Sequence, residues 1–438
     1  MTSDEEVMME RRKFLAGAGA VTAGAVVAAA PGTPGQAVPG IRRVATGLDV
    51  LVDSGFAALA GQRVGVVSNP TGVDSAYRHL VDLMHGSGRV QVVAAFGPEH
   101  GFRGSAQAGG SEGTGTDART GITVYDAYGA SQAKWESLFT TADVDTVVFD
   151  IQDVGARFYT YIWTMYTSMV AAARVGKRYV VLDRPNPVGG RAYGPMMTPA
   201  YTSGVGLKEI VQQHGMTVGE LARFFNAEFL PADAGRTVEL EVVRCRNWKR
   251  DRLAADTDLP WVMPSPNMPT PDTALVYPGT CLFEGVASIT EGRGTCRPFE
   301  LIGGLAGDFD HHWGDRLNAR DLPGVEFREA YFSPTAAGQK PALLNKLCAG
   351  VEVKVVDRAA YDPIRTAVAM LVEARKYPAF AWRFDSYDTV RPYWVDKLTG
   401  SPRLRTMIDA GADVDDVVGA WADELAAFDR RRRPYLLY

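Results

Sequence analysis

Short runs of apolar and β-branched residues alternate with amphipathic segments along most of the chain. The runs predict strands at Val64–Ser68, Val90–Phe96, Ile122–Tyr125, Asp145–Asp150, Tyr179–Asp183 and Val238–Val243. Between them, helical spacing predicts helices at Tyr77–Met84, Ser131–Phe139 and Tyr159–Val175. Thr217 and Glu220 have the pattern of a capping box at the start of a further helix. Strands alternating with helices favour an α/β fold with a Rossmann-like parallel sheet.

A proline-rich stretch, Met263–Pro271, marks the expected boundary between two domains. After it, the pattern predicts a strand at Val351–Val356, a helix at Pro363–Lys376 and a terminal helix at Val414–Asp429. We therefore expect residues 41–265 to form a Rossmann-like catalytic domain. Residues 266–438 are expected to form a smaller α+β domain that contributes to a ligand-binding cleft between the two domains.

Residues 1–40 have the pattern of a targeting segment. The string Arg11-Arg12-Lys13-Phe14-Leu15 precedes an apolar stretch of small residues, which ends in a run rich in proline and glycine. This order predicts a twin-arginine signal peptide and a linker, and hence an extracellular or cell-wall-associated protein. The apolar stretch is too short and too rich in alanine and glycine to predict stable membrane insertion.

Composition narrows the class of protein. Hydrophobic residues at 46% and charged residues at 22% are typical of a globular chain, and a net charge of −5 provides no general attraction to nucleic acid. The four cysteines lack zinc-site spacing, although Cys281 and Cys296 could pair after export. Neither structural zinc nor a nucleic-acid partner is expected.

Polar side chains gather where the predicted strands end. Because ligands of open parallel sheets bind at the carboxyl ends of the strands, we expect these loops to share a site. The candidate substrate-binding residues in these loops are Asn69, His100, Asp150, Asp153, Arg157, Tyr159, Arg184 and Asn186. Ordinary turn chemistry is the alternative for any single loop.

Glu99 is the leading catalytic candidate in these loops. It lies between Pro98 and His100 in a loop bounded by glycines, where a partly buried carboxylic acid could protonate a leaving group. The alternative is a solvated loop acid. Arg157 and Arg184 could bind a substrate carboxylate, or could instead pair with a neighbouring aspartate.

A second concentration of charge spans Thr280–Glu300. Glu284 and Glu291 are further candidate catalytic carboxylates, and Arg293 is a candidate substrate-binding residue. These side chains could form the far wall of a cleft or a strand-turn-strand with solvated charges.

Nucleotide and metal sites are not predicted. No GxGxxG motif follows the first strand and no P-loop is present, so no nucleotide cofactor is expected. His100 with Asp150 and Asp153 is the best metal candidate, but no HxH or HExxH spacing supports a metal. The glycine-rich segment Phe102–Gly121 is expected to cover the site.

Several strings resemble the NamZ-type exo-β-N-acetylmuramidases. They are Ser68–Gly72, Phe96–Gly101, Asp150–Tyr161, Leu182–Pro187 and Pro264–Pro269, and the similarity continues over Thr280–Arg297 and more weakly to the C-terminus. The resemblance implies a Rossmann-like domain, a smaller C-terminal domain and a site in the cleft between them. It also implies release of N-acetylmuramic acid from the non-reducing end of peptidoglycan fragments without a nucleotide cofactor, with Glu99 at the position of the catalytic glutamate.

The residue pattern and the resemblance both favour glycoside hydrolysis. The resemblance also implies an exo-acting enzyme whose partners are peptidoglycan-derived disaccharides or glycan ends. Such enzymes usually use two carboxylates, and retaining, inverting and substrate-assisted mechanisms all stay open at this point. Phe158, Tyr159, Tyr161 and Trp163 could stack on a sugar or belong to the core. The alternatives from other classes are an exported muropeptide- or sugar-binding protein without catalysis and a metal-dependent hydrolase.

Overall fold

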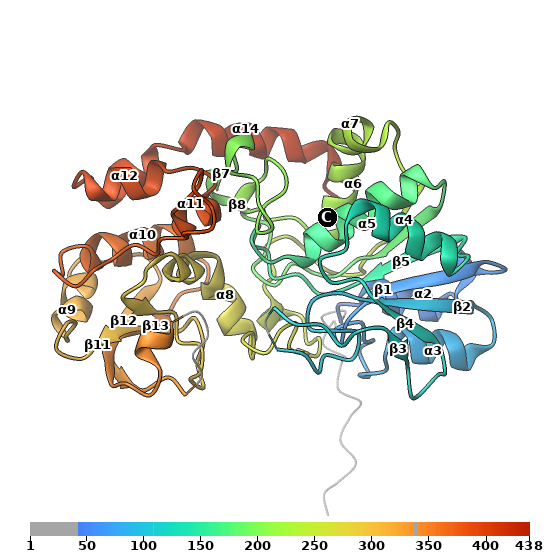
Figure 1. Ribbon diagram of the computed structural model, residues 1–438, viewed down its shortest axis with the longest axis horizontal. Coiled ribbons are helices and arrows are strands. Elements are labelled where there is room, and N and C mark those ends of the chain that lie inside the picture. Colours follow the sequence, from blue (N-terminus) through green and yellow to red (C-terminus); the bar gives the residue numbers. More distant parts are fainter. Residues whose placement is uncertain (1–42, 108, 336–339) are drawn as a thin grey trace, which may run out of the picture. The chain divides into compact units, whose positions relative to one another are not determined.

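A seven-stranded sheet organises the first half of the chain in the computed structural model, which describes residues 43–107, 109–335 and 340–438 (Figure 1). The strands in their order across the sheet are β3 (Gly115–Thr116), β4 (Thr123–Asp126), β2 (Gln91–Gly97), β1 (Arg63–Ser68), β5 (Thr146–Asp150), β6 (Arg178–Leu182) and β9 (Leu240–Val243). All neighbouring strands are parallel except β3, which runs antiparallel to β4. The predicted signal peptide lies outside the described residues.

Alternating side chains of each strand reach two separate cores. On β1, Val66 belongs to the core beneath α2 (Gly47–Asp53) and α3 (Leu80–Ser87). Val67 belongs to the core beneath α4 (Gln132–Thr141), α5 (Tyr161–Arg174) and α6 (Val218–Glu228). Val148 and Phe149 divide in the same way on β5. Successive side chains of a strand point to opposite faces, so the continuous apolar runs of the sequence correspond to strands buried on both faces.

The helices of this half are α2 (Gly47–Asp53), α3 (Leu80–Ser87), α4 (Gln132–Thr141), α5 (Tyr161–Arg174), α6 (Val218–Glu228) and α7 (Leu230–Ala234). A short two-stranded sheet pairs β7 (Tyr193–Met196) with β8 (Val211–Gln213). The predicted capping box is confirmed, because Thr217 Oγ1 accepts from the Glu220 N–H and Glu220 Oε2 accepts from the Thr217 N–H. None of the helices that the structure describes is long and apolar enough to span a membrane.

An antiparallel sheet organises the second half. Its strands in order are β10 (Ile289–Thr290), β11 (Leu301–Leu305), β13 (Cys348–Val355) and β12 (Val325–Phe332). The helices are α8 (Pro271–Thr280), α9 (His312–Asn318), α10 (Pro363–Ala374), α11 (Trp394–Thr399), α12 (Arg403–Asp409), α13 (Val414–Gly419) and α14 (Ala422–Arg432). The predicted α/β class with a smaller α+β part is therefore confirmed.

The predicted single terminal helix is wrong. The chain leaves helical geometry at Trp421, whose φ is −118° and ψ is 14°, and α13 and α14 are separate helices. Trp421 is buried in the large core, with 2% of its surface exposed. Packing of this one large side chain thus overrides the local helical pattern.

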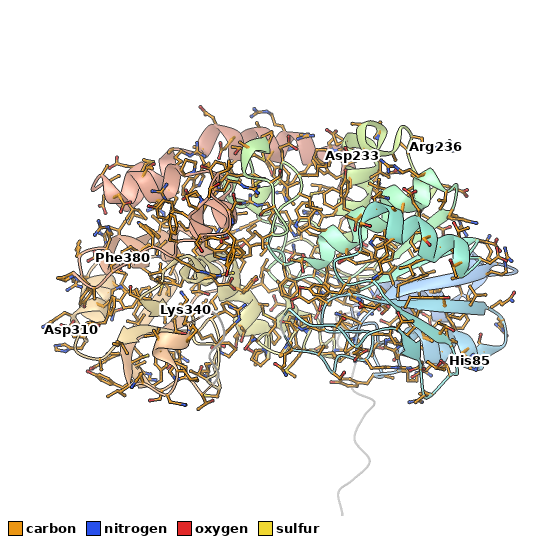
Figure 2. All side chains as sticks on the ribbon, viewed as in Figure 1. His85, Asp233, Arg236, Asp310, Lys340 and Phe380 are labelled. Carbon is orange, nitrogen blue, oxygen red and sulfur yellow. The ribbon has the colours of Figure 1, made fainter. Side chains whose placement is uncertain are left out.

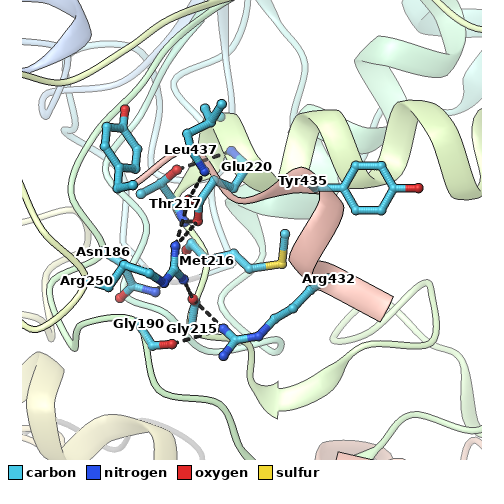
Figure 3. Close-up of polar contacts among 12 residues, drawn as sticks. Asn186, Gly190, Gly215, Met216, Thr217, Glu220, Arg250, Arg432, Tyr435 and Leu437 are labelled. Carbon is cyan, nitrogen blue, oxygen red and sulfur yellow. Dashed lines mark hydrogen bonds and ion pairs between the residues drawn. The ribbon is translucent and has the colours of Figure 1, made fainter. Parts of the chain in front are cut away.

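The last residues of the chain return to the first half of the molecule (Figure 3). The Leu437 N–H donates to Glu220 Oε1 at 2.7 Å, and Arg432 donates to the backbone oxygens of Gly190, His214 and Gly215. The Tyr438 hydroxyl donates to Asp183 Oδ2 at 2.7 Å, while burial raises the pKa of Asp183 to about 7. These contacts fasten the end of the chain to the carboxyl edge of β6 and the start of α6.

Candidate active site

A cleft of about 610 Å³ lies beside the ends of β4, β2 and β5 and includes residues of the second half of the chain. This volume is in the range that holds a small organic ligand. Aromatic side chains form much of its wall, and they are Tyr128, Trp135, Phe158, Tyr159, Tyr161, Trp163, Tyr277, Phe299 and Trp394. Aromatic faces of this kind pack against the C–H faces of sugar rings. The predicted aromatic residues Phe158 to Trp163 therefore line the cleft while being largely buried.

Glu99 lies in the cleft wall directly after β2 and is half-buried. Its Oε1 accepts from the Gly109 N–H at 2.9 Å, and its Oε2 accepts from the Thr160 hydroxyl at 3.1 Å. One contact comes from the glycine-rich segment after β2 and the other from the residue that precedes α5. The carboxyl group is thereby held in one orientation, as a positioned proton donor requires.

His100 also lines the cleft, in a left-handed backbone conformation that is uncommon for residues other than glycine. Its φ is 70°, its N–H donates to Gly110 O at 3.0 Å, and its Nδ1 lies 3.1 Å from Ala106 O. Left-handed backbone at a residue other than glycine is stable only where surrounding contacts enforce it. These contacts hold the loop that carries Glu99.

The segment Phe102–Gly121, expected to cover the site, reaches the cleft through Gly109. Arg103 anchors the segment, because its guanidinium donates to Asp117 at 2.9 Å and to Asp82 at 2.8 Å. Glu112 accepts from the N–H groups of Arg103 and Ser105 within the same segment.

Glu284 provides a second carboxylate in the cleft. It lies in the short 3₁₀ helix Cys281–Gly285 that follows α8, with 8% of its surface exposed. Arg293 Nη1 donates to Glu284 Oε1 at 2.6 Å, and Trp394 Nε1 donates to Oε2 at 3.4 Å. Arg293 itself lines the cleft, so two of the three residues predicted in Thr280–Glu300 belong to the site.

Glu291 does not line the cleft, which corrects its expected catalytic role. It is buried behind Arg293, with 1% of its surface exposed, and its Oε1 accepts from the same Nη1 at 2.7 Å. Burial opposes ionisation, but the charges of Arg293 and Lys340 hold the pKa of Glu291 below its ordinary value. Glu291 is therefore an ionised carboxylate within the protein that supports Arg293.

Arg184 and Asp150 are paired with each other and not available to a ligand. Arg184 Nε and Nη2 donate to the two oxygens of Asp150 at 2.5 and 2.9 Å, and both residues are buried. This outcome corrects the prediction that Arg184 binds a substrate carboxylate, because the guanidinium already holds its anion. The alternative, an ion pair with a neighbouring aspartate, is the one that the structure contains.

Arg157 is also buried away from the cleft. Its Nη1 donates to Pro195 O and Ile210 O at 3.0 and 2.8 Å, and its Nη2 donates to Leu398 O at 2.6 Å. Burial lowers the pKa of Arg157 to about 9. The residue joins three backbone segments and does not contact the cleft, so neither predicted role, carboxylate binding or an aspartate pair, fits it.

Asp153, Asn69 and Asn186 lie beneath the cleft rather than in its wall. Asp153 Oδ2 accepts from His214 Nε2 at 3.0 Å. His214 Nδ1 accepts from the Met216 N–H, which places the proton of a neutral ring on Nε2. The two asparagines close their own loops, Asn69 by accepting from Thr71 and Asn186 by accepting from the Val188 N–H.

The predicted meeting of four loops at one site is therefore only partly correct. The loops after β1, β5 and β6 do meet, but they satisfy one another: Gln152 N donates to Thr71 Oγ1 at 2.8 Å, and Gln152 Nε2 donates to Pro185 O at 3.0 Å. Of the candidate substrate-binding residues, the cleft contains His100, Tyr159 and Arg293. The others are buried and do not line the cleft.

Several cleft residues were not predicted. Thr160 follows directly on Tyr159, and Ser265 and Asn267 lie in the proline-rich stretch that the sequence predicts to be a domain boundary. Trp394, at the start of α11, has no local motif around it. All four cysteines are among the described residues and are free, so no Cys281–Cys296 disulfide is present.

Glu99 and Glu284 line one cleft with aromatic walls, and two carboxylates in such a cleft are characteristic of glycoside hydrolases, the class that this site fits. The chain belongs to the exo-β-N-acetylmuramidase NamZ family. The model of the family's N-terminal part matches residues 64–272, and the model of its C-terminal part matches residues 275–438.

Individual relatives agree with this membership. The chain is 41% identical over 401 residues to the peptidoglycan β-N-acetylmuramidase NamZ of Bacillus subtilis, covering 90% of this chain and 92% of that protein. A DUF1343 family protein of Bacteroides fragilis has a crystal structure with a TM-score of 0.80 and 32% identity, covering 91% of this chain and 100% of that one. A second such protein from the same organism gives a TM-score of 0.68 at 31% identity, over 90% of this chain and 99% of the other.

Proposed function

We propose that this protein is an exo-acting glycoside hydrolase that releases N-acetylmuramic acid from the non-reducing end of peptidoglycan fragments. The observation that carries the proposal is Glu99, held by two hydrogen bonds at the end of β2 inside an aromatic cleft. Membership of the NamZ family supports the substrate class.

Glu99 acts as the general acid in this proposal. Cleavage of the glycosidic bond leaves negative charge on the departing oxygen, and a proton from the Glu99 carboxyl neutralises it. The Thr160 hydroxyl and the Gly109 N–H orient the carboxyl so that the proton is delivered to one place.

Glu284 is the second carboxylate. It lies in the cleft with a guanidinium hydrogen bond to one oxygen and an indole hydrogen bond to the other. A carboxylate placed in this way stabilises the positive charge that develops on the sugar ring in the transition state. Of the two candidates for the second carboxylate, Glu284 lines the cleft and Glu291 does not, so Glu284 is the partner of Glu99 in this proposal.

Turnover of a chromogenic N-acetylmuramide tests the function. We expect release of the chromophore by the purified protein and loss of most of it in Glu99→Gln. Glu239→Gln is the matched control, because the Glu239 side chain is 79% exposed and does not line the cleft. Tight binding of muramides without any turnover would instead favour the non-catalytic binding protein.

We also propose export by the twin-arginine route. Support comes from Arg11 and Arg12, which directly precede an apolar segment of small residues. Replacing both arginines by lysine should retain the protein in the cytoplasm, as measured by cell fractionation. Unchanged export of the double variant would contradict the proposal.

A further inference from the structure

We propose that Arg293, backed by Lys340 and Arg383, forms a carboxylate-binding subsite that selects anionic sugars. This inference rests on the proposed function and adds the basis of its specificity. The ligand group is the lactyl carboxylate, which N-acetylmuramic acid carries and N-acetylglucosamine lacks.

Arg293 is the first element of the subsite. It is the only lysine or arginine among the described residues that line the cleft. Both of its ion pairs use Nη1, and its Nε and Nη2 have no hydrogen-bond partner in the part of the chain that the structure describes. The guanidinium lies 4.8 Å from the centre of the Phe299 ring, which fixes its plane. One edge of the group thus stays available for a bidentate contact with a carboxylate.

The surrounding charges leave an excess of one positive charge. Glu284 and Glu291 provide two negative charges next to Arg293. Lys340, labelled in Figure 2 in the part that holds the second sheet, is buried, donates to Phe283 O at 2.9 Å and interacts electrostatically with both glutamates. The positive charges of Arg293 and Lys340 therefore neutralise the two carboxylates, and the charge of Arg383 comes in addition.

Arg383 supplies the excess. Its guanidinium lies 4.8 Å from the centre of the Trp394 ring, which lines the cleft, and its Nη1 is buried without a hydrogen-bond partner. Among the described residues Arg383 forms no ion pair, and its charge acts on Lys340. A buried donor without a partner is unfavourable, and a bound anion nearby would offset its charge.

Neighbouring charges do not cancel this excess. Lys397 lies 5.4 Å from the centre of the same Trp394 ring, but it pairs with Asp385 at 2.6 Å and with Asp388 at 3.2 Å. Arg391 also pairs with Asp388, at 3.0 Å. That group of four is neutral, so the wall beside Glu284 retains the net positive charge.

Binding of three free sugars, measured by isothermal titration calorimetry, separates charge recognition from sugar recognition. The sugars are N-acetylmuramic acid, its methyl ester and N-acetylglucosamine, tested against wild type, Arg293→Gln and Arg297→Gln. The ester keeps the lactyl group but removes its charge. We expect wild type to bind the acid about 10- to 100-fold more tightly than the ester, as a charged hydrogen-bonded pair implies. Arg293→Gln should lose this preference.

Arg297→Gln is the matched control, since Arg297 lies in the same segment but outside the cleft lining and pairs with Glu300. It should keep the preference of wild type. If Arg293→Gln does not fold, as judged by circular dichroism, Arg383→Gln supplies the same test, because Arg383 does not line the cleft. It should reduce the preference for the acid while retaining binding of the ester.

Equal binding of acid and ester by wild type, or an unchanged preference in folded Arg293→Gln and Arg383→Gln, would overturn the subsite. Neither outcome depends on turnover. A wild-type protein that prefers the acid but releases no product would contradict the proposed function and leave the subsite in place.

Discussion

Thr160 donates its hydroxyl to Glu99 Oε2 at 3.1 Å, so the residue that precedes α5 holds the acid that follows β2. The two strands that lead into these residues are separated by β1 in the sheet. The contact therefore joins segments that follow two non-adjacent strands, and it connects the loop of Glu99 to the start of the helix that follows β5.

Replacement of Glu99 by glutamine should lower kcat on a natural disaccharide by about 10²- to 10⁴-fold, because the amide cannot donate a proton to the leaving group. The loss should be smaller on a substrate with a phenolate leaving group of low pKa, which departs without protonation. Steady-state kinetics on both substrates measure the difference. Equal losses on both would argue against the general-acid role.

Replacement of Thr160 by valine should lower kcat about two- to tenfold, which corresponds to one neutral hydrogen bond. Valine retains the shape of the side chain but leaves the carboxyl of Glu99 with a single partner. The effect should fall mainly on the natural substrate, whose leaving group needs the proton. Thr160→Ser, which restores the hydroxyl, serves as the control and should recover most of the activity.

Glu284→Gln and Glu291→Gln should have different effects: the first should lower activity and the second should lower stability. Glu284→Gln should abolish most activity even on substrates with activated leaving groups. The second carboxylate stabilises charge on the sugar ring, which develops with any leaving group. Glu291→Gln removes the charge that offsets buried Arg293 and Lys340, and the free energy of unfolding should fall by up to about 3–5 kcal/mol. Urea unfolding and kcat of both variants measure these effects. A stable but inactive Glu291→Gln beside an active Glu284→Gln would instead assign the catalytic role to Glu291.

Arg184→Gln should lower the free energy of unfolding by about 3–5 kcal/mol, because it leaves the buried carboxyl of Asp150 without its partner. Burial already raises the pKa of Asp150 above its ordinary value despite Arg184. The KM of the protein that remains folded should stay close to that of wild type. A raised KM without loss of stability would return Arg184 to substrate binding.

Lys340 should make stability depend on pH in the alkaline range. Burial lowers its pKa to about 8, whereas the ordinary value is 10.5. Between these values the unfolded chain binds more protons at this residue than the folded chain, so its contribution to stability rises with pH and is lost as pH falls through about 8.

Urea unfolding of wild type and Lys340→Met at about pH 7 and about pH 10 measures this contribution. The difference in unfolding free energy, wild type minus variant, should be larger at the higher pH. The subtraction removes groups that titrate equally in both proteins. A difference that shrinks as the pH is raised would contradict the lowered pKa of Lys340.

Much of the architecture follows from local patterns. The apolar run of β5 is buried at every position, and the Thr217–Glu220 pair forms its capping box within four residues. The candidate acid also follows from sequence. Glu99 comes directly after the predicted strand Val90–Phe96, and ligands bind at the carboxyl ends of parallel strands. The family could likewise be recognised from short strings near these strand ends.

The partners of charged side chains could not be predicted in this way. The sequence suggests Arg157 and Arg184 for a substrate carboxylate and Arg293 only for a cleft wall, yet the fold pairs Arg184 with Asp150 and places Arg293 in the cleft lining. Trp394 reaches Glu284 from 110 residues further along the chain. Electrostatic pairing and burial depend on distances between segments remote in sequence, so the sequence by itself determined the strands, the helix start and the candidate acid, whereas tertiary structure decided which charges face the substrate.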